Sequence, residues 1–330
     1  MNKLRWGILG VAKINERIVP AFQETRLAEL SAIASRSLEK ARRAAEADAI
    51  PKAYGSYDEL LDDPDIDAVY IPLPNHLHAE WTLKAGKRGK HVLCEKPLCP
   101  TADEARALVD ACRGLGIRLM DGFMWPHHPR TREIRDFLDN GGLGEVRHVH
   151  ASFTFELPLD DSNIRLHPEM GGGSLLDVGC YPVYGIRWAF DDEPQSVWAT
   201  ATWYNGVDLR MTGILKFADG KTGSFDCGFD LPFRGDMEIV GTLGTLRVPD
   251  MWLPPYDAEF EVERNDRRVE RFELSGHDQI VLMIDDFSQA VLDNRDPIPS
   301  PEEAIRTLRV LDALARSARE GREVAVAREP

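Results

Sequence analysis

His91-Val92-Leu93-Cys94-Glu95-Lys96-Pro97-Leu98 is the most informative stretch of this sequence. Its first half is an apolar run of strand length, and a Glu-Lys-Pro turn follows directly. In an open α/β sheet, a polar turn at the carboxyl end of a strand lies at the edge where such sheets bind ligands. Proline restricts the backbone of this turn. For the tripeptide alone, a solvated surface lysine is the plainer interpretation. Whether the lysine has a function therefore depends on the surrounding sequence.

Strands and helices alternate through the first 122 residues. Ser37, Ser56 and Thr101 stand where helices are expected to begin, and Ser56 and Thr101 are each followed three residues later by a glutamate, as in a capping box. The alternation predicts a doubly wound parallel sheet, a Rossmann domain over residues 1–122. The expected strands are 4–9, 27–34, 67–71, 91–94 and 117–120, and the expected helices run up to residue 22, over 38–47, from 57, over 76–87 and from 102.

A glycine turn follows the first expected strand. Gly7 and Gly10 fit a dinucleotide-binding fingerprint, whereas Ala12 and Asn15 occupy its later positions. Ala12 still allows a fairly close approach of a pyrophosphate to the helix N-terminus, but Asn15 weakens the pattern. An ordinary strand–helix turn is the alternative. The expected cofactor-binding residues of this turn are Gly7, Gly10, Val11, Ala12, Lys13 and Ile14.

The end of the second expected strand indicates which nucleotide the fold binds. A carboxylate at this point would bind the ribose hydroxyls of NAD, but this chain has Ser35-Arg36-Ser37. A hydroxyl and a guanidinium fit a 2′-phosphate, to which arginine makes bidentate charge-assisted hydrogen bonds. Lys40 adds a second positive charge one helical turn later. We therefore expect NADP as the cofactor, with NAD as the alternative.

The composition is that of a soluble, globular chain with two domains. It has 330 residues, 43% of them hydrophobic and 29% charged. A net charge of −15 argues against nucleic acid and anionic membranes as partners, because both attract basic surfaces. The chain enters a strand at Leu4, so we expect no signal peptide. The five cysteines lack paired spacing, which predicts a cytoplasmic protein without a metal site.

After Gly122 the strands no longer alternate with helices. They follow one another directly, and Asp219-Gly220 is typical of a hairpin turn. This pattern predicts an α+β domain with a mainly antiparallel sheet over residues 123–330. Helices are expected at 130–139, 278–292 and 301–318, and strands at 146–155, 196–204, 209–217, 223–229, 238–240, 245–248, 259–262 and 269–272.

The expected strand 196–204 is apolar on both faces. Val197 and Trp203 lie on one face, and Trp198 and Tyr204 lie on the other. If one face packs on helices, the second needs another cover, and a partner subunit is the simplest candidate. We therefore expect a homodimer or homotetramer that associates through the sheet of the second domain.

The segment from Gly171 to Pro182 carries a second group of residues with chemical potential. Its three consecutive glycines permit close approach of the backbone, and Pro182 suits the first turn of a helix. Asp177 and Tyr181 stand four residues apart and can face the same side. For Tyr181 alone, core packing with a satisfied hydroxyl is the plainer interpretation.

In order and spacing, these segments resemble the family of glucose-fructose oxidoreductases, inositol dehydrogenases and their relatives (the Gfo/Idh/MocA family) across essentially the whole chain. The matching pieces are the Gly7–Asn15 turn, Ser35-Arg36, Pro74-Asn75-His76-Leu77-His78, Glu95-Lys96-Pro97 and Gly171–Tyr181. The resemblance implies a Rossmann domain followed by an open-faced antiparallel sheet, with catalysis at the seam. Tyr181 stands where the inositol dehydrogenases have a histidine. With Arg165, this makes the chain look like the branch of NADP-dependent aldose (xylose-type) dehydrogenases, dihydrodiol dehydrogenases and glucose-fructose oxidoreductase.

Two departures from the family pattern concern single positions. Ala12 replaces the second fingerprint glycine, and Pro126 replaces a residue that is often arginine or another bulky side chain, which leaves the substrate open. The export signal of glucose-fructose oxidoreductase is also missing, so a tightly retained cofactor is not expected. With the glycine turn, the cofactor-binding residues that we expect are Ser35, Arg36, Lys40, Pro72, Leu73, Asn75, His78, Glu95, Lys96 and Arg165.

Lys96, Asp177 and Tyr181 are the expected catalytic residues. Oxidation of a secondary alcohol or a sugar hemiacetal needs a base for the hydroxyl proton, and a free tyrosine, with a pKa near 10, is a poor base at neutral pH. A nearby ammonium favours the phenolate. We therefore expect Tyr181 to accept the proton and Lys96 to lower its pKa and hold the substrate oxygen. Asp177 would orient the substrate or Lys96, Asn75 and His78 would line the nicotinamide side, and Glu95 would position the Lys96 turn.

Other reactions on the same scaffold stay open. The three catalytic residues would equally serve reduction of a keto sugar or dehydrogenation of a cyclic dihydrodiol, because proton and hydride transfers are reversible. A non-catalytic nucleotide sensor is the alternative of another class, and it predicts loss of these residues, which are present. The substrate is expected to be a sugar or related cyclic alcohol, and the candidates for recognising it are Trp125, His127, His128, Arg165, His167 and Tyr184.

Overall fold

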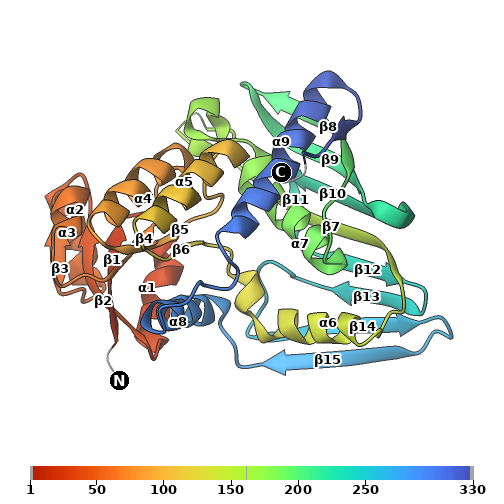
Figure 1. Ribbon diagram of the computed structural model, residues 1–330, viewed down its shortest axis with the longest axis horizontal. Coiled ribbons are helices and arrows are strands. Elements are labelled where there is room, and N and C mark those ends of the chain that lie inside the picture. Colours follow the sequence, from red (N-terminus) through yellow and green to blue (C-terminus); the bar gives the residue numbers. More distant parts are fainter. Residues whose placement is uncertain (1–2, 161, 328–330) are drawn as a thin grey trace. The chain divides into compact units, whose positions relative to one another are not determined.

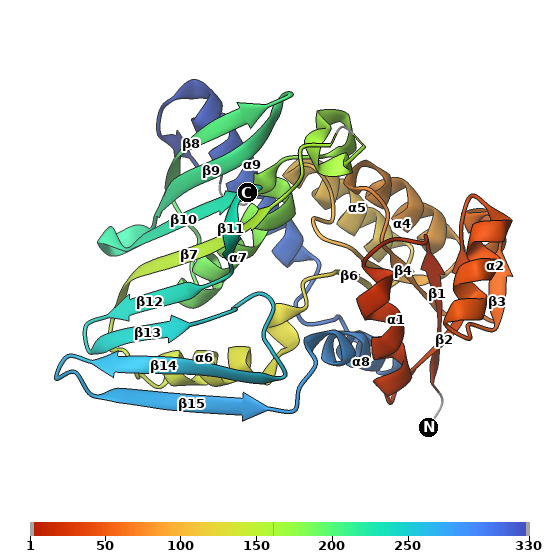
Figure 2. The same cartoon turned by 180° about the vertical axis from the view of Figure 1, so that it is seen from behind.

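The computed structural model describes residues 3–160 and 162–327, which fall into two compact units (Figures 1 and 2). The first unit comprises the residues up to His127 together with Asp278–Ile305, and the second comprises His128–His277 and the residues from Arg306 on. A late segment of the chain therefore belongs to the first unit, and only long-range packing places it there. The division expected from the sequence, at residues 122 and 123, stays a prediction.

The first unit contains the predicted parallel sheet. Its strand order is β3-β2-β1-β4-β5-β6, and each pair within it is parallel. This is the order of a doubly wound nucleotide-binding fold, in which the chain changes direction between β1 and β4. The strands are β1 (Leu4–Leu9), β2 (Ala28–Ala34), β3 (Lys52–Tyr54), β4 (Ala68–Ile71), β5 (His91–Cys94) and β6 (Leu119–Asp121).

Helices cover both faces of this sheet, and the serine and threonine caps hold as predicted. Ser37, Ser56 and Thr101 each accept a hydrogen bond from the backbone amide three residues later. Helices α4 and α5 lie side by side on one face, and α1 and α8 pack together on the other (Figure 1). The helices are α1 (Asn15–Glu24), α2 (Leu38–Ala47), α3 (Tyr57–Leu61), α4 (His78–Lys87), α5 (Ala102–Gly114) and α8 (Gln279–Leu292), with 3₁₀ turns at Asn75–Leu77 and Trp125–His127.

Helix α8 joins the first unit through its apolar face. Ile280, Met283 and Phe287 are buried in the same core as Trp6 of β1 and Phe22 of α1. The rings of Trp6 and Phe287 lie 5.4 Å apart. This burial explains why α8 packs with strands that lie far earlier in the sequence, and local sequence patterns do not reveal this packing.

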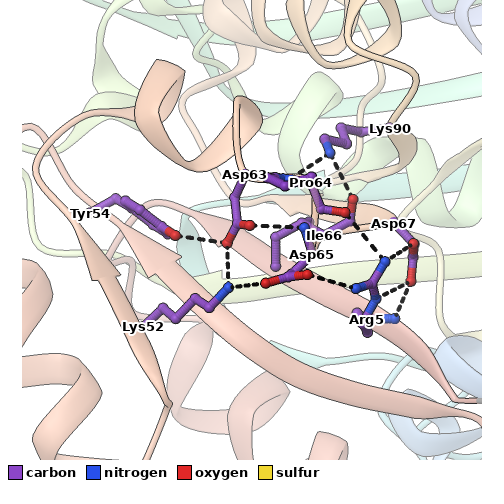
Figure 3. Close-up of polar contacts among 9 residues, drawn as sticks. All are labelled: Arg5, Lys52, Tyr54, Asp63, Pro64, Asp65, Ile66, Asp67 and Lys90. Atoms are coloured by element: carbon purple, nitrogen blue, oxygen red, sulfur yellow. Dashed lines mark hydrogen bonds and ion pairs between the residues drawn. The ribbon is translucent and has the colours of Figure 1, made fainter.

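A network of charged residues ties the amino ends of the strands together (Figure 3). Asp63 accepts hydrogen bonds from Lys52 Nζ at 2.9 Å and from Tyr54 Oη at 2.7 Å. Arg5 donates through Nη2 to Asp67 at 2.8 Å, and Lys90 Nζ, which is buried, donates to the carbonyls of Asp63 and Ile66. These contacts join the loops before β4 and β5 to β1 and β3, and none of them involves the turns that are predicted to bind the cofactor, so we infer a structural role.

Asp63 makes this network sensitive to acid. Burial acts to raise its pKa, but the hydrogen bonds from Lys52 and Tyr54 lower it from 3.8 to about 2. The stabilisation is therefore complete above about pH 4 and is lost as the pH falls through 2. We expect Asp63→Asn to reduce the free energy of unfolding by about 2 kcal/mol at neutral pH. This difference between variant and wild type should disappear as the pH falls below 2. Urea titrations across this range measure the difference, and Glu39→Gln, in an exposed pair with Arg43, should be neutral throughout.

The second unit is built on one large, mainly antiparallel sheet, as predicted. Its order is β15-β14-β13-β12-β7-β10-β9-β8-β16, with β11 paired to β7. Strand β7 lies between two meanders and pairs parallel with β10 and antiparallel with β12. The strands are β7 (Val146–Glu156), β8 (Ser196–Tyr204), β9 (Val207–Lys216), β10 (Thr222–Gly228), β11 (Asp230–Arg234), β12 (Met237–Gly241), β13 (Gly244–Val248), β14 (Asp257–Arg264), β15 (Val269–Ser275) and β16 (Val324–Ala325).

One face of this sheet carries helices (Figure 2). They are α6 (Pro129–Asp139), α7 (Cys180–Phe190) and α9 (Glu302–Glu320), with a π-helical turn at Leu175–Gly179 and 3₁₀ turns at Ile164–Leu166, Pro168–Met170 and Ala218–Gly220. Arg130 of α6 is buried and donates to the backbone carbonyls of Pro249, Asp250 and Glu259, which fixes this helix to the loop after β13 and to β14. Helix α9 approaches β8, where Ser317 Oγ accepts from Ala199 N at 3.0 Å.

The strand boundaries differ from prediction where long-range pairing decides them. Strands β3, β11 and β16 were not predicted, because each is short and is defined by its neighbour in the sheet. Strand β6 starts at Leu119 rather than at Ile117, because the Ile117 amide still bonds to the carbonyl of Cys112 at the end of α5. The expected parallel and antiparallel sheets are otherwise confirmed.

The five cysteines are all free and buried. In the described part of the chain, no helix combines the length and the apolarity that a membrane span requires. Residues 3–160 and 162–327 also hold no cluster of three or more His, Cys, Asp or Glu side chains placed to bind a metal ion.

Candidate functional site

The turns predicted to bind a cofactor all leave the same edge of the parallel sheet. Gly10 follows β1, Ser35 follows β2, Pro72 follows β4 and Glu95 follows β5. The strand registers align these ends, since Leu9 pairs with Ala34 and Ile71 pairs with Cys94. Because the chain changes direction between β1 and β4, this edge is the switch point at which open α/β sheets bind ligands.

The glycine turn is shaped by two close contacts. Gly10 has a φ of +138°, and a Cβ at this position would lie 3.2 Å from Leu73 Cδ2. Asn15, the residue that weakens the fingerprint, is buried and donates from Nδ2 to the Gly10 carbonyl at 2.9 Å. The asparagine thus braces the turn by a hydrogen bond, where the usual pattern relies on a small residue. Val11, Ala12 and Ile14 are partly buried, and Lys13 is exposed.

Arg36 lies just before α2 and Lys40 lies in its first turn, and both residues are exposed. Ser35 is buried, and its hydroxyl accepts from Ser37 N at 3.3 Å, which holds the backbone on which Arg36 sits. Burial raises the pKa of Tyr57, and the Arg36 guanidinium beside the phenol opposes this rise. The predicted pair of cations therefore borders the edge that Gly10 also lines.

The Glu-Lys-Pro turn is anchored through Glu95. Its Oε1 accepts from the buried Tyr70 hydroxyl at 2.5 Å, and its Oε2 accepts from the Lys96 backbone amide at 3.3 Å. The Glu95 amide in turn donates to the Ile71 carbonyl at 3.1 Å. These contacts fix the backbone of Lys96 to β4, and the peptide bond between Lys96 and Pro97 is cis.

His78 lies beneath this turn rather than at the surface of the edge. Its ring is fully buried, with Nδ1 2.9 Å from the Pro97 carbonyl and Nε2 2.7 Å from the Leu73 carbonyl. Burial lowers the pKa of this imidazole. The ring thus connects the loop after β4 to the loop after β5. Its predicted place beside the nicotinamide stays a prediction, as does that of Asn75, which opens the 3₁₀ turn before α4.

The three consecutive glycines of the second segment, Gly171, Gly172 and Gly173, are each required for a different steric reason. Gly171 has a φ of +75°, which ends a 3₁₀ turn in the left-handed conformation. A Cβ on Gly172 would lie 2.5 Å from the Arg165 carbonyl, and one on Gly173 would lie 2.3 Å from Asp208 Oδ1. A larger residue at either of the last two positions would displace the segment that precedes Tyr181.

Asp177 and Tyr181 follow on a helical run that starts as a π-turn and continues as α7. Asp177 Oδ2 accepts from Arg165 Nε at 2.6 Å, so the structure pairs two residues to which the sequence assigned separate roles. The Tyr181 ring is buried, with its centroid 5.0 Å from Phe153 and 5.9 Å from Trp252. Lys96 belongs to the first unit and Asp177 and Tyr181 to the second. Their joint action on one substrate stays a prediction.

Most of the substrate candidates prove to be buried. Trp125, His128 and Tyr184 are at most 6% exposed, and His127, which is also buried, places Nδ1 2.8 Å from Asp286. Three contributors were missed in the sequence: Tyr70, which holds Glu95, Phe153, which packs on Tyr181, and Asp208. Their partners lie 25 or more residues away, and no local signal reveals such contacts.

The edge of the first unit fits a dinucleotide with a 2′-phosphate. Gly10 leaves room beside Leu73 that a Cβ would fill, and the exposed guanidinium of Arg36 supplies the charge for the phosphate. Neither Ser35 nor Arg36 could serve as the carboxylate that would bind the unphosphorylated ribose. The donor set therefore matches NADP.

Comparison with known proteins gives matches along most of the chain. A model described as an oxidoreductase family with an NAD-binding Rossmann fold matches residues 4–123, and the GFO/IDH/MocA C-terminal domain model matches residues 131–247. The D-xylose 1-dehydrogenase (NADP(+)) 2 of Haloferax volcanii is 39% identical over 97% of this chain and 99% of its own length.

Two further relatives carry related activities. The trans-1,2-dihydrobenzene-1,2-diol dehydrogenase of Xenopus tropicalis is 35% identical over 76% of this chain and 77% of its own. Among solved structures, a 3-ketoreductase of Actinomadura kijaniata in complex with NADP and TDP-benzene superposes with a TM-score of 0.89. It is 35% identical, and the match covers 96% of this chain and 98% of the ketoreductase.

Proposed function

Because the chain belongs to the GFO/IDH/MocA family of oxidoreductases, we propose that it transfers a hydride between NADP and a hydroxyl- or keto-bearing carbon of a sugar. The observation that carries the proposal is the carboxyl edge of the parallel sheet, where Gly10, Arg36 and Lys96 follow β1, β2 and β5. The glycine turn would hold the pyrophosphate and Arg36 the 2′-phosphate. NADP, when bound, supplies the acceptor or donor of the hydride.

The chain's own residues would handle the proton. In this proposal Tyr181 Oη accepts the proton of the reacting hydroxyl, and Lys96 Nζ holds the oxygen and favours its deprotonation. Asp177, held by Arg165, orients the substrate. The packing of Tyr181 against Phe153 and Trp252 and the anchoring of Lys96 through Glu95 support these roles, because both side chains start from fixed backbones.

Oxidation of an aldose to its lactone is the reaction we favour. The relative with 39% identity over nearly the whole chain is a D-xylose 1-dehydrogenase. Reduction of a keto sugar and oxidation of a trans-dihydrodiol are the alternatives, since relatives with these activities also match.

A spectrophotometric screen tests this proposal. Aldoses, polyols and dihydrodiols are each offered with NADP and with NAD, and keto sugars are offered with NADPH. We expect reduction of NADP with at least one aldose, at a higher kcat/KM than with NAD. Absence of turnover with every compound, in both directions, would contradict the assignment, and turnover with dihydrodiols or keto sugars alone would select an alternative.

Arg36 should set the preference for NADP. We expect Arg36→Ala to raise the KM for NADP by about 10-fold or more, because a charge-assisted hydrogen bond to the phosphate contributes about 1.5–3 kcal/mol. The KM for NAD should change less than about twofold. Arg42→Ala, which removes an exposed arginine within α2, is the matched control and should change neither KM. Equal effects of Arg36→Ala on both cofactors would show that Arg36 does not bind the 2′-phosphate.

We also propose that the second unit self-associates through the sheet face that carries no helix. Trp198 and Ile214 pair across β8 and β9 and are 39% and 40% exposed, although both side chains are apolar. An exposed apolar patch on a sheet is typical of an interface. Light scattering across micromolar concentrations should give at least twice the 37.1 kDa of one chain, and a monomeric mass throughout would exclude this association.

A cytoplasmic location is a further proposal, supported by the five free, buried cysteines. Thiols that stay unpaired suit a reducing compartment. Fractionation of cells that express the protein should recover it with the cytosolic markers, and recovery in an exported fraction would contradict the proposal.

A further inference from the structure

Asp208 is a buried carboxylate that has no role in the proposed reaction. It is the second residue of β9, its residue exposure is 8%, and its neighbours Val207 and Leu209 are buried as well. Burial of an acidic side chain costs free energy unless hydrogen bonds compensate for the lost water. The groups that bond to Asp208 therefore indicate what it does.

Both hydrogen bonds to Asp208 come from the segment that leads to Tyr181. Its Oδ2 accepts from Ser174 Oγ at 2.7 Å and from Leu175 N at 2.6 Å. Its Oδ1 occupies the space where a Cβ on Gly173 would lie, at 2.3 Å, and Gly173 has a φ of +112°. Three consecutive residues are thus shaped around one carboxylate, and we call Asp208, Gly173, Ser174 and Leu175 the bracket.

The bracket replaces a local helix cap. Leu175 begins the π-helical turn that continues into α7, and the first amides of a helix lack partners within the helix. The Ser174 side chain, at the N-cap position, donates to Asp208, and Asp208 accepts from the first helical amide. Burial raises the pKa of Asp208, while the hydrogen bonds from Ser174 and Leu175 oppose the rise. A residue 33 positions away in the sequence therefore fixes where this helix starts.

A second contact holds the same helical run against the sheet. A Cβ on Gly179 would lie 2.9 Å from Cys227 Sγ of β10, so only glycine allows the run to approach so closely. The bracket and this contact lie on either side of Asp177, and Tyr181 follows two residues after Gly179. The π-helical turn between them widens the backbone, which is a feature often found at functional sites. The orientation of both side chains thus depends on β9 and β10.

We propose that Asp208 is a positioning residue that sets the orientation of Asp177 and Tyr181 through the bracket. The proposal rests on the proposed function in that it takes these two side chains as the reactive ones. It assigns to Asp208 an effect on turnover but none on NADP binding, because the residues proposed to hold the pyrophosphate and the 2′-phosphate, all of them described in the structure, belong to the other unit and make no hydrogen bond to Asp208.

Two substitutions of Asp208 separate positioning from charge. Asp208→Ala removes both hydrogen bonds, and we expect kcat to fall about 10-fold or more while the Kd for NADP changes less than about twofold. Asp208→Asn keeps an acceptor oxygen for Ser174 and Leu175 and should restore kcat to within about threefold of the wild type. The pH at half-maximal kcat should move in Asp208→Ala and stay in Asp208→Asn, because only the first displaces the proton acceptor.

Asp278→Ala is the matched control. Asp278 also accepts from two amides at the start of a helix, those of Ile280 and Val281, but this helix is α8. Its loss should lower the melting temperature and leave kcat and its pH profile unchanged. If Asp208→Ala gave the same pattern as Asp278→Ala, Asp208 would be merely structural and the proposal would be overturned. If Asp208→Ala fails to fold, Ser174→Ala tests the proposal instead. We then expect kcat to fall about two- to threefold, and an unchanged kcat would contradict the proposal.

Hydrogen exchange keeps this test independent of the activity. In Asp208→Ala the amides of residues 174–181 should exchange at least about 10-fold faster than in the wild type, whereas those of residues 184–190 should keep their rate. Unchanged exchange over 174–181 would overturn the bracket even if no substrate were found. If the wild type turned over no compound in the screen, but residues 174–181 still exchanged faster in Asp208→Ala, the proposed function would be wrong. The structural role of the bracket would then be confirmed.

Discussion

Tyr181→Phe should lower kcat by at least about 100-fold while the Kd for NADP changes less than about twofold. Phenylalanine keeps the ring that packs against Phe153 and Trp252 but removes the oxygen that is to accept the substrate proton. A positioned general base contributes about 100- to 10,000-fold, so its loss should appear in kcat rather than in binding. Stopped-flow and steady-state kinetics measure the loss, and fluorescence titration measures NADP binding.

The control for this substitution is Tyr256→Phe. Tyr256 is 66% exposed, and we expect its loss to change kcat less than about twofold. Thermal unfolding of both variants shows whether packing is retained. A Tyr181→Phe variant with near-normal turnover would remove Tyr181 from the mechanism and leave the bracket with no reactive tyrosine to position.

Lys96→Ala should also lower kcat by about 100-fold or more. The ammonium is proposed to hold the substrate oxygen and to favour its negative form, and neither alanine nor water at this position supplies a fixed charge. The acid limb of the pH profile of kcat should move to higher pH, because an ammonium favours a deprotonated acceptor and its removal disfavours it. The pH dependence of kcat, measured on variant and wild type with saturating NADP, gives both quantities.

Lys87→Ala, which removes an exposed lysine at the end of α4, is the matched control and should leave kcat and its profile unchanged. Glu95→Gln tests the anchoring of the same turn, because it keeps an acceptor for Tyr70 but removes the charge. An unshifted acid limb in Lys96→Ala would show that Lys96 has no part in the proton transfer, even if turnover fell.

The nucleotide edge was predictable because its signals are local. Apolar strands end at Leu9, Ala34, Ile71 and Cys94, and the turns after them are recognisable from glycine, arginine and proline. Parallel strands bring their carboxyl ends to one edge, so a sequence that specifies the strands also specifies the edge. The serine and threonine caps were predictable for the same reason, since each cap involves residues only three apart.

What was missed depends on contacts between distant parts of the chain. Asp208 lies 33 residues after the amide that it caps, and the sequence shows it only as one acid near the start of an apolar strand. The place of His78 beside the nicotinamide stays a prediction, but the contacts of its buried ring with two carbonyl groups are not revealed by any spacing in the sequence. Helix α8 was predicted to within one residue at its start, but its place in the first unit follows from a core that also contains residues of the first strands and helices.

The proposed hydride transfer is tested most directly by following a label from the sugar to the cofactor. An aldose that carries deuterium on the carbon of its hemiacetal hydroxyl is oxidised with NADP, and the NADPH formed is analysed by mass spectrometry. We expect one deuterium in each NADPH molecule and a lower kcat with the labelled sugar. NADPH free of deuterium would contradict the claim that this chain moves a hydride between a sugar carbon and NADP, and no NADPH from any aldose would exclude the aldose-to-lactone reaction.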